Sequence, residues 1–309
     1  MTKIATRDAY GQALVEIGGK NSDVVVLDAD LSKSTKTVDF AKAYPDRFFD
    51  MGIAEQGMIG TAAGFATAGK IPFASTFAVF ATARVMDQVR NSVAYPKLNV
   101  KIAATHAGLT VGEDGGSHQA IEDIAYMRAV PNMTVIVPAD ATETKQVIEA
   151  AVEYQGPMYI RLGRPAVPVL FDESYEFQIG KGYEMLHGND ITIIACGIMV
   201  SKAVEASKLL AEQGIVVRLI NMSTIKPLDA EIIIKAAQET KAIITVEEHS
   251  IIGGLGSAVA EVLAENCPTK LKRIGVQDTF GESGTPDALL EKYGLTSERI
   301  VQTAKELLQ

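Results

Sequence analysis

A single acidic residue, Glu55, precedes a stretch built almost wholly from glycine, alanine and apolar residues. Gly57, Gly60 and Gly64 follow at spacings of three and four, which places them on one face of a helix. Such a face lets another backbone approach closely, and that packing must offset the roughly 1 kcal/mol that each glycine costs a helix. We expect apolar surroundings for the Glu55 carboxyl group, which suit it to exchange a proton with a nitrogen of a bound ring. The plainer alternative is a packed helix whose N-terminus interacts with Glu55.

A second candidate combines His106 with the segment Gly112-Glu-Asp-Gly-Gly-Ser-His-Gln119. Its two histidines, His106 and His118, are half of the four in the chain. Glycines on either side of Asp114 and His118 let the backbone bend sharply and present both side chains to a ligand. Imidazole and carboxylate groups can hydrogen-bond sugar hydroxyls and relay protons near neutral pH. A metal site is disfavoured because no further ligand occurs at a useful spacing. A solvated glycine-rich turn is the remaining alternative.

Aromatic and basic residues provide two further sets. Phe77 and Phe80 lie three residues apart among small residues and could form a platform for a flat ring, although aromatics at this spacing more often belong to a core. Arg7, Arg161 and Arg164 are the basic candidates, and scattered arginines are usually surface residues. Neither set indicates a function by itself.

The segment Gly253-Gly-Leu-Gly-Ser257 superficially resembles a nucleotide-binding loop. It lacks both the Gly-x-Gly-x-x-Gly spacing and the lysine of a phosphate-binding loop. It is interpreted as a tight connection from a strand to a helix, with a regulatory or vestigial anion site as the alternative.

The elements that position these residues alternate along the chain. Short β-rich runs followed by longer helical patterns favour an α/β fold in which parallel sheets are flanked by helices. Residues 163–182 interrupt the alternation, so we expect two domains, 1–168 and 183–309, joined by a linker at 169–182. The expected strands cover residues 24–27, 73–75, 101–105, 134–137, 159–161, 191–196, 216–221 and 242–246. The expected helices cover residues 6–17, 55–67, 140–154 (with Asp140 and Thr142 near its start), 199–213, 229–239, 256–266 and 297–308.

Composition narrows the class of protein. With 309 residues, 47% hydrophobic and 22% charged, the chain matches a folded protein of two domains. A net charge of −9 argues against general binding to nucleic acid or anionic membranes. Cys196 and Cys267 could pair only with each other, which favours a reducing interior. No signal-peptide pattern or membrane-spanning run is found, so a cytoplasmic location is expected.

Several of these segments together resemble the transketolase family of thiamine-diphosphate enzymes, in the same order along the chain. The matching blocks are Gly52-Ile-Ala-Glu-Gln56, Ala104-Thr-His-Ala-Gly108, Gly112-Glu-Asp-Gly-Gly-Ser-His-Gln119 and Pro131-Asn-Met-Thr-Val-Ile-Val-Pro-Ala-Asp140. The resemblance covers essentially the whole chain but only the later half of a usual transketolase, namely its pyrimidine-binding and C-terminal domains.

The resemblance implies a partner. The family's Gly-Asp-Gly block, which binds Mg²⁺ and the diphosphate, belongs to the N-terminal half and is not found here. The chain therefore resembles the C-terminal subunit of a split transketolase, which would act only with an N-terminal subunit that supplies the Mg²⁺ ligands. A two-plus-two heterotetramer is expected, with phosphorylated sugars as substrates.

The resemblance also implies roles for individual residues. Glu55 would hydrogen-bond the aminopyrimidine ring, which Phe77, Phe80 and Ile53 would contact, while Asp30 would lie near the thiazolium. His106 and His118 would act in catalysis and contact the substrate near the reacting carbons. The further residues expected to bind the sugar are Asp114, which would read hydroxyl configuration, and the phosphate-gripping Arg7, Ser34 and Arg164.

The sequence departs from the family at two points. Ala83 stands where a third aromatic residue is common, and the glutamate block also resembles that of 1-deoxyxylulose-5-phosphate synthase. Glu113-Asp114 favours transketolase over that enzyme. The β subunit of a 2-oxo acid dehydrogenase shares the fold but is not expected to have the set of His106, Asp114 and His118. A non-catalytic binding or regulatory protein of the same fold is the alternative from a different class.

Overall fold

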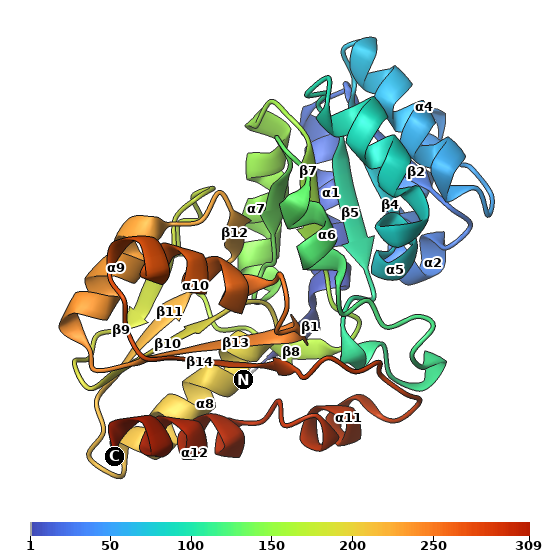
Figure 1. Cartoon of the computed structure of the whole chain (residues 1–309). Helices are drawn as coiled ribbons and strands as arrows, with labels where there is room; N and C mark the ends of the chain where they lie inside the picture. Colours follow the sequence, from blue (N-terminus) through green and yellow to red (C-terminus); the bar gives the residue numbers. More distant parts are fainter. Residues whose placement is uncertain (1) are drawn as a thin grey trace.

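The first half of the chain forms six parallel strands of a sheet that is buried on both faces (Figure 1), and one antiparallel strand is added at its edge. The computed structural model describes residues 2–309. Along β2, Val24 and Val26 belong to one hydrophobic cluster while Val25 and Leu27 belong to another, because successive strand side chains point to opposite faces. The sheet has the order β12-β6-β7-β5-β4-β2-β3. Its strands are β2 (Val24–Asp28), β3 (Phe48–Asp50), β4 (Ile71–Phe77), β5 (Lys101–Thr105), β6 (Thr134–Ile136), β7 (Met158–Arg161) and β12 (Thr224–Lys226).

Helices cover both faces of this sheet. Tyr10 and Leu14 of α1 and Val147 of α7 pack on one face, and Met58 of α4 and Ile124 of α6 pack on the other. The helices of this half are α1 (Thr6–Lys20), α2 (Ser32–Thr35), α3 (Val38–Ala43), α4 (Glu55–Thr67), α5 (Ala78–Ala81), α6 (Asp123–Ala129) and α7 (Ala141–Glu153), with a π-helical segment at Gln88–Ala94 and a 3₁₀ segment at Leu109–Asp114.

The second half repeats this architecture around a five-stranded sheet of order β14-β13-β10-β11-β9, in which only β9 is antiparallel to its neighbour. Helices α8, α11 and α12 pack on one face and α9 and α10 on the other. The strands are β9 (Tyr183–Leu186), β10 (Ile191–Ala195), β11 (Val217–Asn221), β13 (Ile243–Ser250) and β14 (Leu271–Val276). The helices are α8 (Met199–Ala211), α9 (Ala230–Glu239), α10 (Leu255–Asn266), α11 (Pro286–Lys292) and α12 (Ser297–Leu308).

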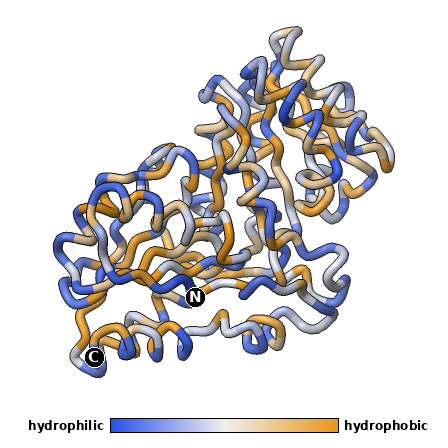
Figure 2. Tube along the Cα trace, in the orientation of Figure 1, coloured by the Kyte–Doolittle hydropathy of each residue, from blue (hydrophilic) through white to orange (hydrophobic). Residues whose placement is uncertain are grey.

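The two halves are interlocked. β12 comes from the second half but pairs with β6 of the first sheet. β1 (Lys3–Ala5) pairs with β8 (Ala166–Pro168) as a separate two-stranded sheet beside the junction (Figure 1). One hydrophobic cluster contains residues of both halves, among them Val137 and Ile220, and the apolar segments of the trace run through both bodies (Figure 2). The relative position of the halves is therefore held by shared core.

The expected α/β architecture is confirmed, and most expected elements are present within a few residues of their expected bounds. Asp140 caps α7 by accepting a hydrogen bond from the N–H of Glu143 at 2.9 Å. Residues 169–182 contain neither helix nor strand, but β8 lies inside the irregular stretch 163–182. This pairing was not expected because β8 depends on a partner more than 160 positions earlier in the chain.

The connection at Gly253-Gly-Leu-Gly-Ser257 is tight, as expected, and the alternative of an anion site there is wrong. Glu247 accepts hydrogen bonds from the N–H groups of Leu255 and Gly256 at 2.7 and 2.8 Å. The protein's own carboxylate thus occupies the N-terminus of α10, where a bound anion would otherwise be stabilised.

Among residues 2–309, no helix is long and apolar enough to cross a lipid bilayer.

Candidate active site

The candidate residues gather where the parallel strands of the first sheet end. Ser34 follows β2, Phe77 ends β4, His106 follows β5 and Arg164 follows β7. These four strands are neighbours in the order β7-β5-β4-β2. The carboxyl edge of an open parallel sheet is where such folds bind ligands, because the loops there converge from several strands.

A buried aspartate organises the loop after β2. Asp28 accepts hydrogen bonds from the N–H of Leu31 at 2.7 Å and from the hydroxyls of Thr35 and Thr37 at 2.6 and 2.9 Å. Burial raises the pKa of this carboxyl, and the hydrogen bonds oppose that rise. The loop that carries Asp30 and Ser34 is therefore anchored to the end of β2.

Glu55 lies at the first position of α4 and is ion-paired. Its side chain is 5% exposed, and its Oε1 lies 2.6 Å from Nη1 of Arg84. The guanidinium carbon of Arg84 lies 4.1 Å from the centroid of the Phe80 ring. The sequence predicted apolar surroundings for Glu55, and this ion pair is a correction to that prediction. The sequence contains only a weak signal for this ion pair, because Arg84 lies 29 residues after Glu55.

Aromatic and imidazole rings form a continuous group beside this ion pair. Phe77 and Phe80 stack with an interplanar angle of 11° and a centroid distance of 6.0 Å. His106 stacks on Phe77 at 3.8 Å, and His118 meets the Phe80 ring edge-on at 5.5 Å. The two phenylalanines thus form the expected platform, and both histidines lie against it.

His106 is held in one orientation. Nη1 of Arg7 lies 3.0 Å from its Nε2, and a guanidinium can only donate, so Nε2 is the acceptor. The proton therefore lies on Nδ1, which donates to Oγ1 of Thr105 at 2.9 Å. Burial, and then the charge of Arg7, lower the pKa of His106 to about 3, so the ring is neutral near pH 7. Its backbone has φ 56°, an uncommon value outside glycine that often occurs at functional sites.

Basic side chains surround the neutral imidazole. Arg164 and Lys36 contribute with Arg7 and His118 to the lowering of the His106 pKa. Arg7 also donates to the main-chain oxygen of Ser34 at 3.1 Å. Such a group of cations is suited to a phosphate or another compact anion. Lys36 was not predicted from the sequence to be a member of this basic group. Ser34 contacts Arg7 through its main-chain carbonyl oxygen and not through its hydroxyl.

Arg164 connects this group to the glycine-rich loop. Its guanidinium donates to the main-chain oxygen of Val111 and lies 3.2 Å from Oε2 of Glu113. Asp114 is exposed at the end of the 3₁₀ segment. The expected sugar-binding residues thus come from the segments that follow β2, β5 and β7 and, for Arg7, from the first turn of α1.

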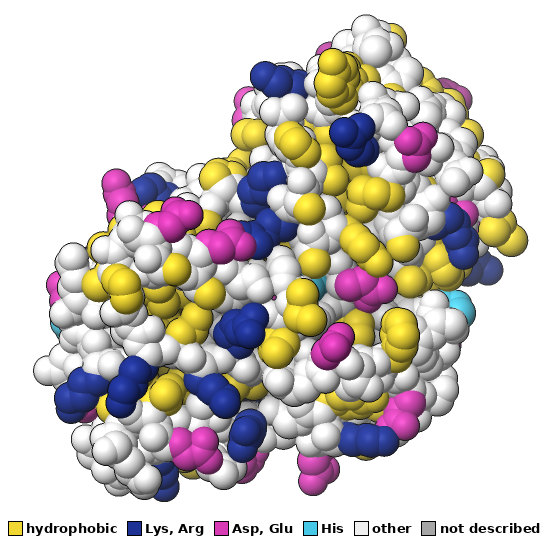
Figure 3. Space-filling view, viewed as in Figure 1, with side chains coloured by type: hydrophobic (Ala, Val, Ile, Leu, Met, Phe, Trp, Pro, Cys, Tyr) yellow, Lys and Arg dark blue, Asp and Glu magenta, His cyan; other side chains and the backbone are white. Residues whose placement is uncertain are grey.

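Two expected cofactor contacts lie at the surface. Ile53 is 80% exposed, and Asp30 is exposed with its N–H bonded to Oδ1 of Asp50 at 3.1 Å. Hydrophobic side chains also gather over the first domain in the view of Figure 3. Among residues 2–309, no hydrogen bond or ion pair joins Ile53 or Asp30 to the group of rings formed by Phe77, Phe80, His106 and His118.

The glycine face of α4 is open. Cβ atoms added at Gly60 and Gly64 meet nothing within 4 Å, and one at Gly57 meets only Ala54 at 3.9 Å. The sequence predicted that another backbone packs here. Within the described residues 2–309 no backbone packs on this face. Packing within this chain therefore does not offset the helix stability that these glycines cost.

Arg161 is a structural residue. It is buried, lies 2.7 Å from Oδ2 of Asp123, and donates to the main-chain oxygens of Ala120 and Glu248 at 3.0 Å each. It therefore joins β7 to the second domain and does not reach the basic group around His106.

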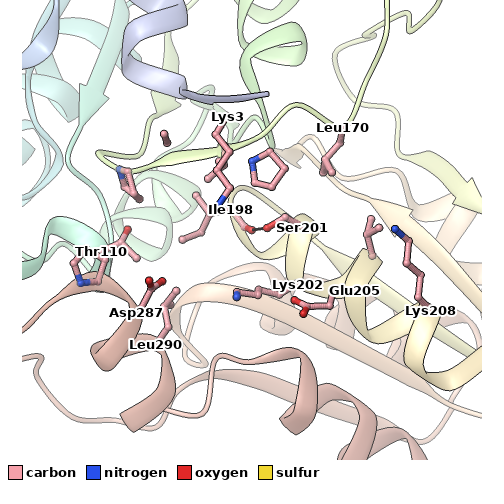
Figure 4. Close-up of a pocket in the computed structure, with 16 residues that line it drawn as sticks. Lys3, Thr110, Leu170, Ile198, Ser201, Lys202, Glu205, Lys208, Asp287 and Leu290 are labelled. Carbon is pink, nitrogen blue, oxygen red and sulfur yellow. Dashed lines mark hydrogen bonds between the residues drawn. The ribbon is translucent and has the colours of Figure 1, made fainter. Parts of the chain in front are cut away.

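A cavity of about 350 Å³ lies at the junction of the two halves (Figure 4). Its walls come from β1, β8, α8 and α11, and lysines such as Lys3 and Lys202 lie among apolar side chains. It contains none of the residues expected to bind cofactor or sugar. Across residues 2–309, no group of three or more His, Cys, Asp or Glu side chains is arranged to hold a metal ion.

Comparison with known proteins gives two family matches. Residues 2–169 match the model described as transketolase, pyrimidine binding domain, and residues 180–300 match the model described as transketolase, C-terminal domain. Together they cover nearly all of the chain.

Similar proteins of known name agree with these matches. The chain is 54% identical to a putative transketolase C-terminal section of Methanocaldococcus jannaschii, over 97% of this chain and 95% of that protein. It is 46% identical to the 6-deoxy-6-sulfo-D-fructose transketolase subunit SqwH of Clostridium sp. (strain MSTE9), over 98% and 94% of the two chains. It is 38% identical to rat (Rattus norvegicus) transketolase over 99% of this chain, but spans only 49% of that protein.

A solved structure described as a split-gene transketolase in an inactive β4 tetramer superposes with a TM-score of 0.93. It is 58% identical to this chain and covers 99% of this chain and 98% of its own.

Proposed function

The chain belongs to the transketolase family and corresponds to its C-terminal section, and from this premise we propose that it is the C-terminal subunit of a two-subunit transketolase. It transfers a two-carbon ketol unit from a ketose phosphate to an aldose phosphate with thiamine diphosphate. One observation carries the proposal: a continuous series of contacts runs from Glu55 through Arg84, Phe80, Phe77 and His106 to Arg7. At one end of this series, the Glu55 carboxylate would bind a ring nitrogen of the cofactor. At the other end, the basic group around Arg7 would bind an anion of the substrate.

The residues present fit the pyrimidine half of the cofactor. A flat group that donates a hydrogen bond to Glu55 and lies on Phe80 is already accommodated, because the Arg84 guanidinium does both. Glu55 would hold or move a proton at a ring nitrogen, and Phe77 and Phe80 would support the ring. Exposed Ile53 and Asp30 would complete the contacts on the pyrimidine and thiazolium sides. When bound, thiamine diphosphate supplies the electron sink for breaking a carbon–carbon bond.

The histidines would act on the sugar as hydrogen-bonding groups. His106 is neutral near pH 7 because burial lowers its pKa to about 3, so it can accept from a hydroxyl at Nε2 when Arg7 turns to the substrate. His118, beside Phe80, would contact the oxygens near the reacting carbons. Exposed Asp114 would read the configuration of an acceptor hydroxyl. These groups orient the substrate and protect the reacting atoms from water.

Arg7, Arg164 and Ser34 would bind the distal anion of the sugar, assisted by the neighbouring Lys36. Guanidinium groups bind a phosphate dianion through paired, charge-assisted hydrogen bonds. The similar subunit from Clostridium is named for a sulfonated sugar, so the anion and the sugar can differ among such subunits. We take phosphorylated sugars as the substrate class of this chain.

The partner would be an N-terminal section that supplies the diphosphate site and the Mg²⁺ ligands. Support for this partner comes from the open glycine face of α4, directly beyond Glu55, where a Cβ atom added at Gly60 or Gly64 would meet nothing within 4 Å among residues 2–309. Exposed Ile53 lies just before the same helix. A backbone of another subunit can approach this face closely. A two-plus-two heterotetramer is the assembly we propose.

The test is ketol transfer from xylulose 5-phosphate to ribose 5-phosphate with thiamine diphosphate and Mg²⁺. The chain alone is compared with the chain mixed with whatever polypeptide is encoded or co-purifies beside it. Activity only in the mixture is the expected result. A mixture that forms a complex and binds the cofactor, but transfers no ketol unit from any sugar phosphate tested, would overturn the proposal.

A further inference from the structure

Arg84 makes the two contacts, with Glu55 and Phe80, that the proposed function assigns to the cofactor's aminopyrimidine. Its Nη1 lies 2.6 Å from Oε1 of Glu55, and its guanidinium carbon lies 4.1 Å from the centroid of Phe80. We propose that Arg84 is an internal placeholder for the pyrimidine ring, which keeps Glu55 paired in the cofactor-free subunit and must turn away when the cofactor binds. This inference rests on the proposed function.

The chemical likeness of the two groups supports this inference. A guanidinium is planar, presents N–H donors along its edge and stacks on aromatic faces. An aminopyrimidine that binds Glu55 must likewise be flat, lie on the aromatic platform and meet the same carboxylate oxygen. Arg84 therefore makes the two contacts that would otherwise hold the ring, and both groups cannot make them at once.

The ion pair with Arg84 stabilises the subunit in the absence of cofactor, because the Glu55 carboxylate is buried. The Glu55 side chain is 5% exposed, and a buried carboxylate without a partner is costly. The Arg84 side chain is 45% exposed, so its far side faces solvent. Pairing with Arg84 stabilises the carboxylate before the ring nitrogen is available to replace it.

The anchoring of Arg84 shows which part would move. Nε2 of Gln56 donates to the main-chain oxygen of Arg84 at 3.0 Å, and Val85, the next residue, is fully buried. The backbone at Arg84 is thus tied to α4 next to Glu55. A rotation of the side chain alone releases Glu55 and uncovers the face of Phe80, with no rearrangement of the fold.

Competition between Arg84 and the ring has a measurable consequence. The cofactor must displace an ion pair and a cation–π contact, and removal of both should tighten its binding about tenfold. Arg84→Met removes the charge and the planar group while keeping a similar length. Arg84→Gln keeps a flat amide that can still donate to Glu55, so its affinity should lie between those of Arg84→Met and the parent.

The test is isothermal titration of thiamine diphosphate, in saturating Mg²⁺, into the complex of this chain with its N-terminal partner. Arg90→Met is the matched control, because Arg90 is an exposed arginine six residues further along the chain whose side chain donates to Oδ1 of Asn91. We expect Kd to fall about tenfold for Arg84→Met and to stay unchanged for Arg90→Met. Thermal unfolding of each complex checks that the variants fold.

Each other result has a defined meaning. Equal Kd values for the parent and Arg84→Met would overturn the placeholder role alone. A weaker Kd for Arg84→Met would also overturn it, because Arg84 would then be a positioning residue that supports Glu55 in the loaded enzyme. If neither the parent nor any variant complex bound the cofactor, the proposed function would fall, and this inference with it.

Discussion

Glu248 of the second domain holds the histidine loop of the first. Its Oε1 accepts a hydrogen bond from the main-chain N–H of Thr110 at 2.6 Å, four residues after His106. Gly108, with φ 79°, passes so close to the Glu248 carboxylate that a side chain there has no room. The second domain therefore contributes to the site by fixing the course of this loop, although its own side chains do not join the basic group.

This contact predicts a pH dependence of stability. Burial raises the pKa of Glu248 to about 7, and Arg161 opposes the rise. Because the folded pKa lies above the ordinary value of 4.5, the stabilisation is complete below pH 4.5 and is lost as the pH rises through about 7. Glu248→Gln keeps a neutral side chain throughout. As the pH rises from 5 to 8.5, the free energy of unfolding of the parent should fall relative to that of the variant by up to about 3 kcal/mol.

Urea unfolding at several pH values measures this difference, with Glu265→Gln, an exposed change on α10, as the control. Parallel curves for Glu248→Gln and the parent would show that Glu248 does not titrate in this range. Burial also raises the pKa of Glu247 to about 7. Glu247 is present in both proteins, so its contribution to the pH dependence of stability cancels in the comparison.

Glu55→Gln tests the proposed proton exchange. Glutamine keeps the size of the side chain and a hydrogen-bonding oxygen but cannot exchange a proton with a ring nitrogen. We expect assembly with the N-terminal partner to be unchanged and turnover to fall at least about 100-fold. Size-exclusion chromatography and a ketol-transfer assay measure the two properties. Unchanged turnover would refute the role of Glu55.

Arg164→Ala tests the anion site. A charge-assisted hydrogen bond to a phosphate contributes about 1.5–3 kcal/mol, so KM for phosphorylated sugars should rise roughly 10- to 100-fold with little change in kcat. An unphosphorylated acceptor such as glycolaldehyde should be used as well by the variant as by the parent. Arg299→Ala, a change at an exposed residue of α12, is the control. An equal loss with both acceptors would mean that Arg164 supports the loop through Val111 and Glu113 instead.

The glycine face of α4 predicts opposite effects in the lone chain and in the assembly. Gly60→Ala meets no neighbour and should stabilise the chain alone by up to about 1 kcal/mol. Gly60→Leu should leave the chain folded but prevent assembly with the N-terminal partner. Thermal unfolding and analytical ultracentrifugation measure the two effects. Assembly of Gly60→Leu with normal affinity would exclude this face as an interface.

A glycine of another helix serves as the contrast. At Gly18 of α1 an added Cβ would lie 2.5 Å from the Phe40 ring. Gly18→Ala should therefore destabilise the chain alone, by about 1–3 kcal/mol, because the packing must shift. The two alanine variants together separate an open glycine face from a packed one.

The fold class and the residues of the candidate site could be predicted from local patterns in the sequence. Runs such as residues 101–105, followed by polar or basic residues, indicate buried parallel strands whose ends carry functional side chains. His106 and Arg164 follow neighbouring strands, so their meeting at one edge is a consequence of topology. Asp140 indicated the start of α7 because a cap acts within a single turn.

Only the tertiary structure decided which distant groups meet. Arg84 pairs with Glu55 across 29 positions, and Glu248 bonds Thr110 across 138. β12 joins the first sheet from the second half of the chain. The sequence by itself determined the periodicities, the caps and the order of the chemical groups, because these depend on neighbours along the chain. The partner of a buried charge and the open face of α4 depend on which surfaces pack together, and that is decided only when the whole chain folds.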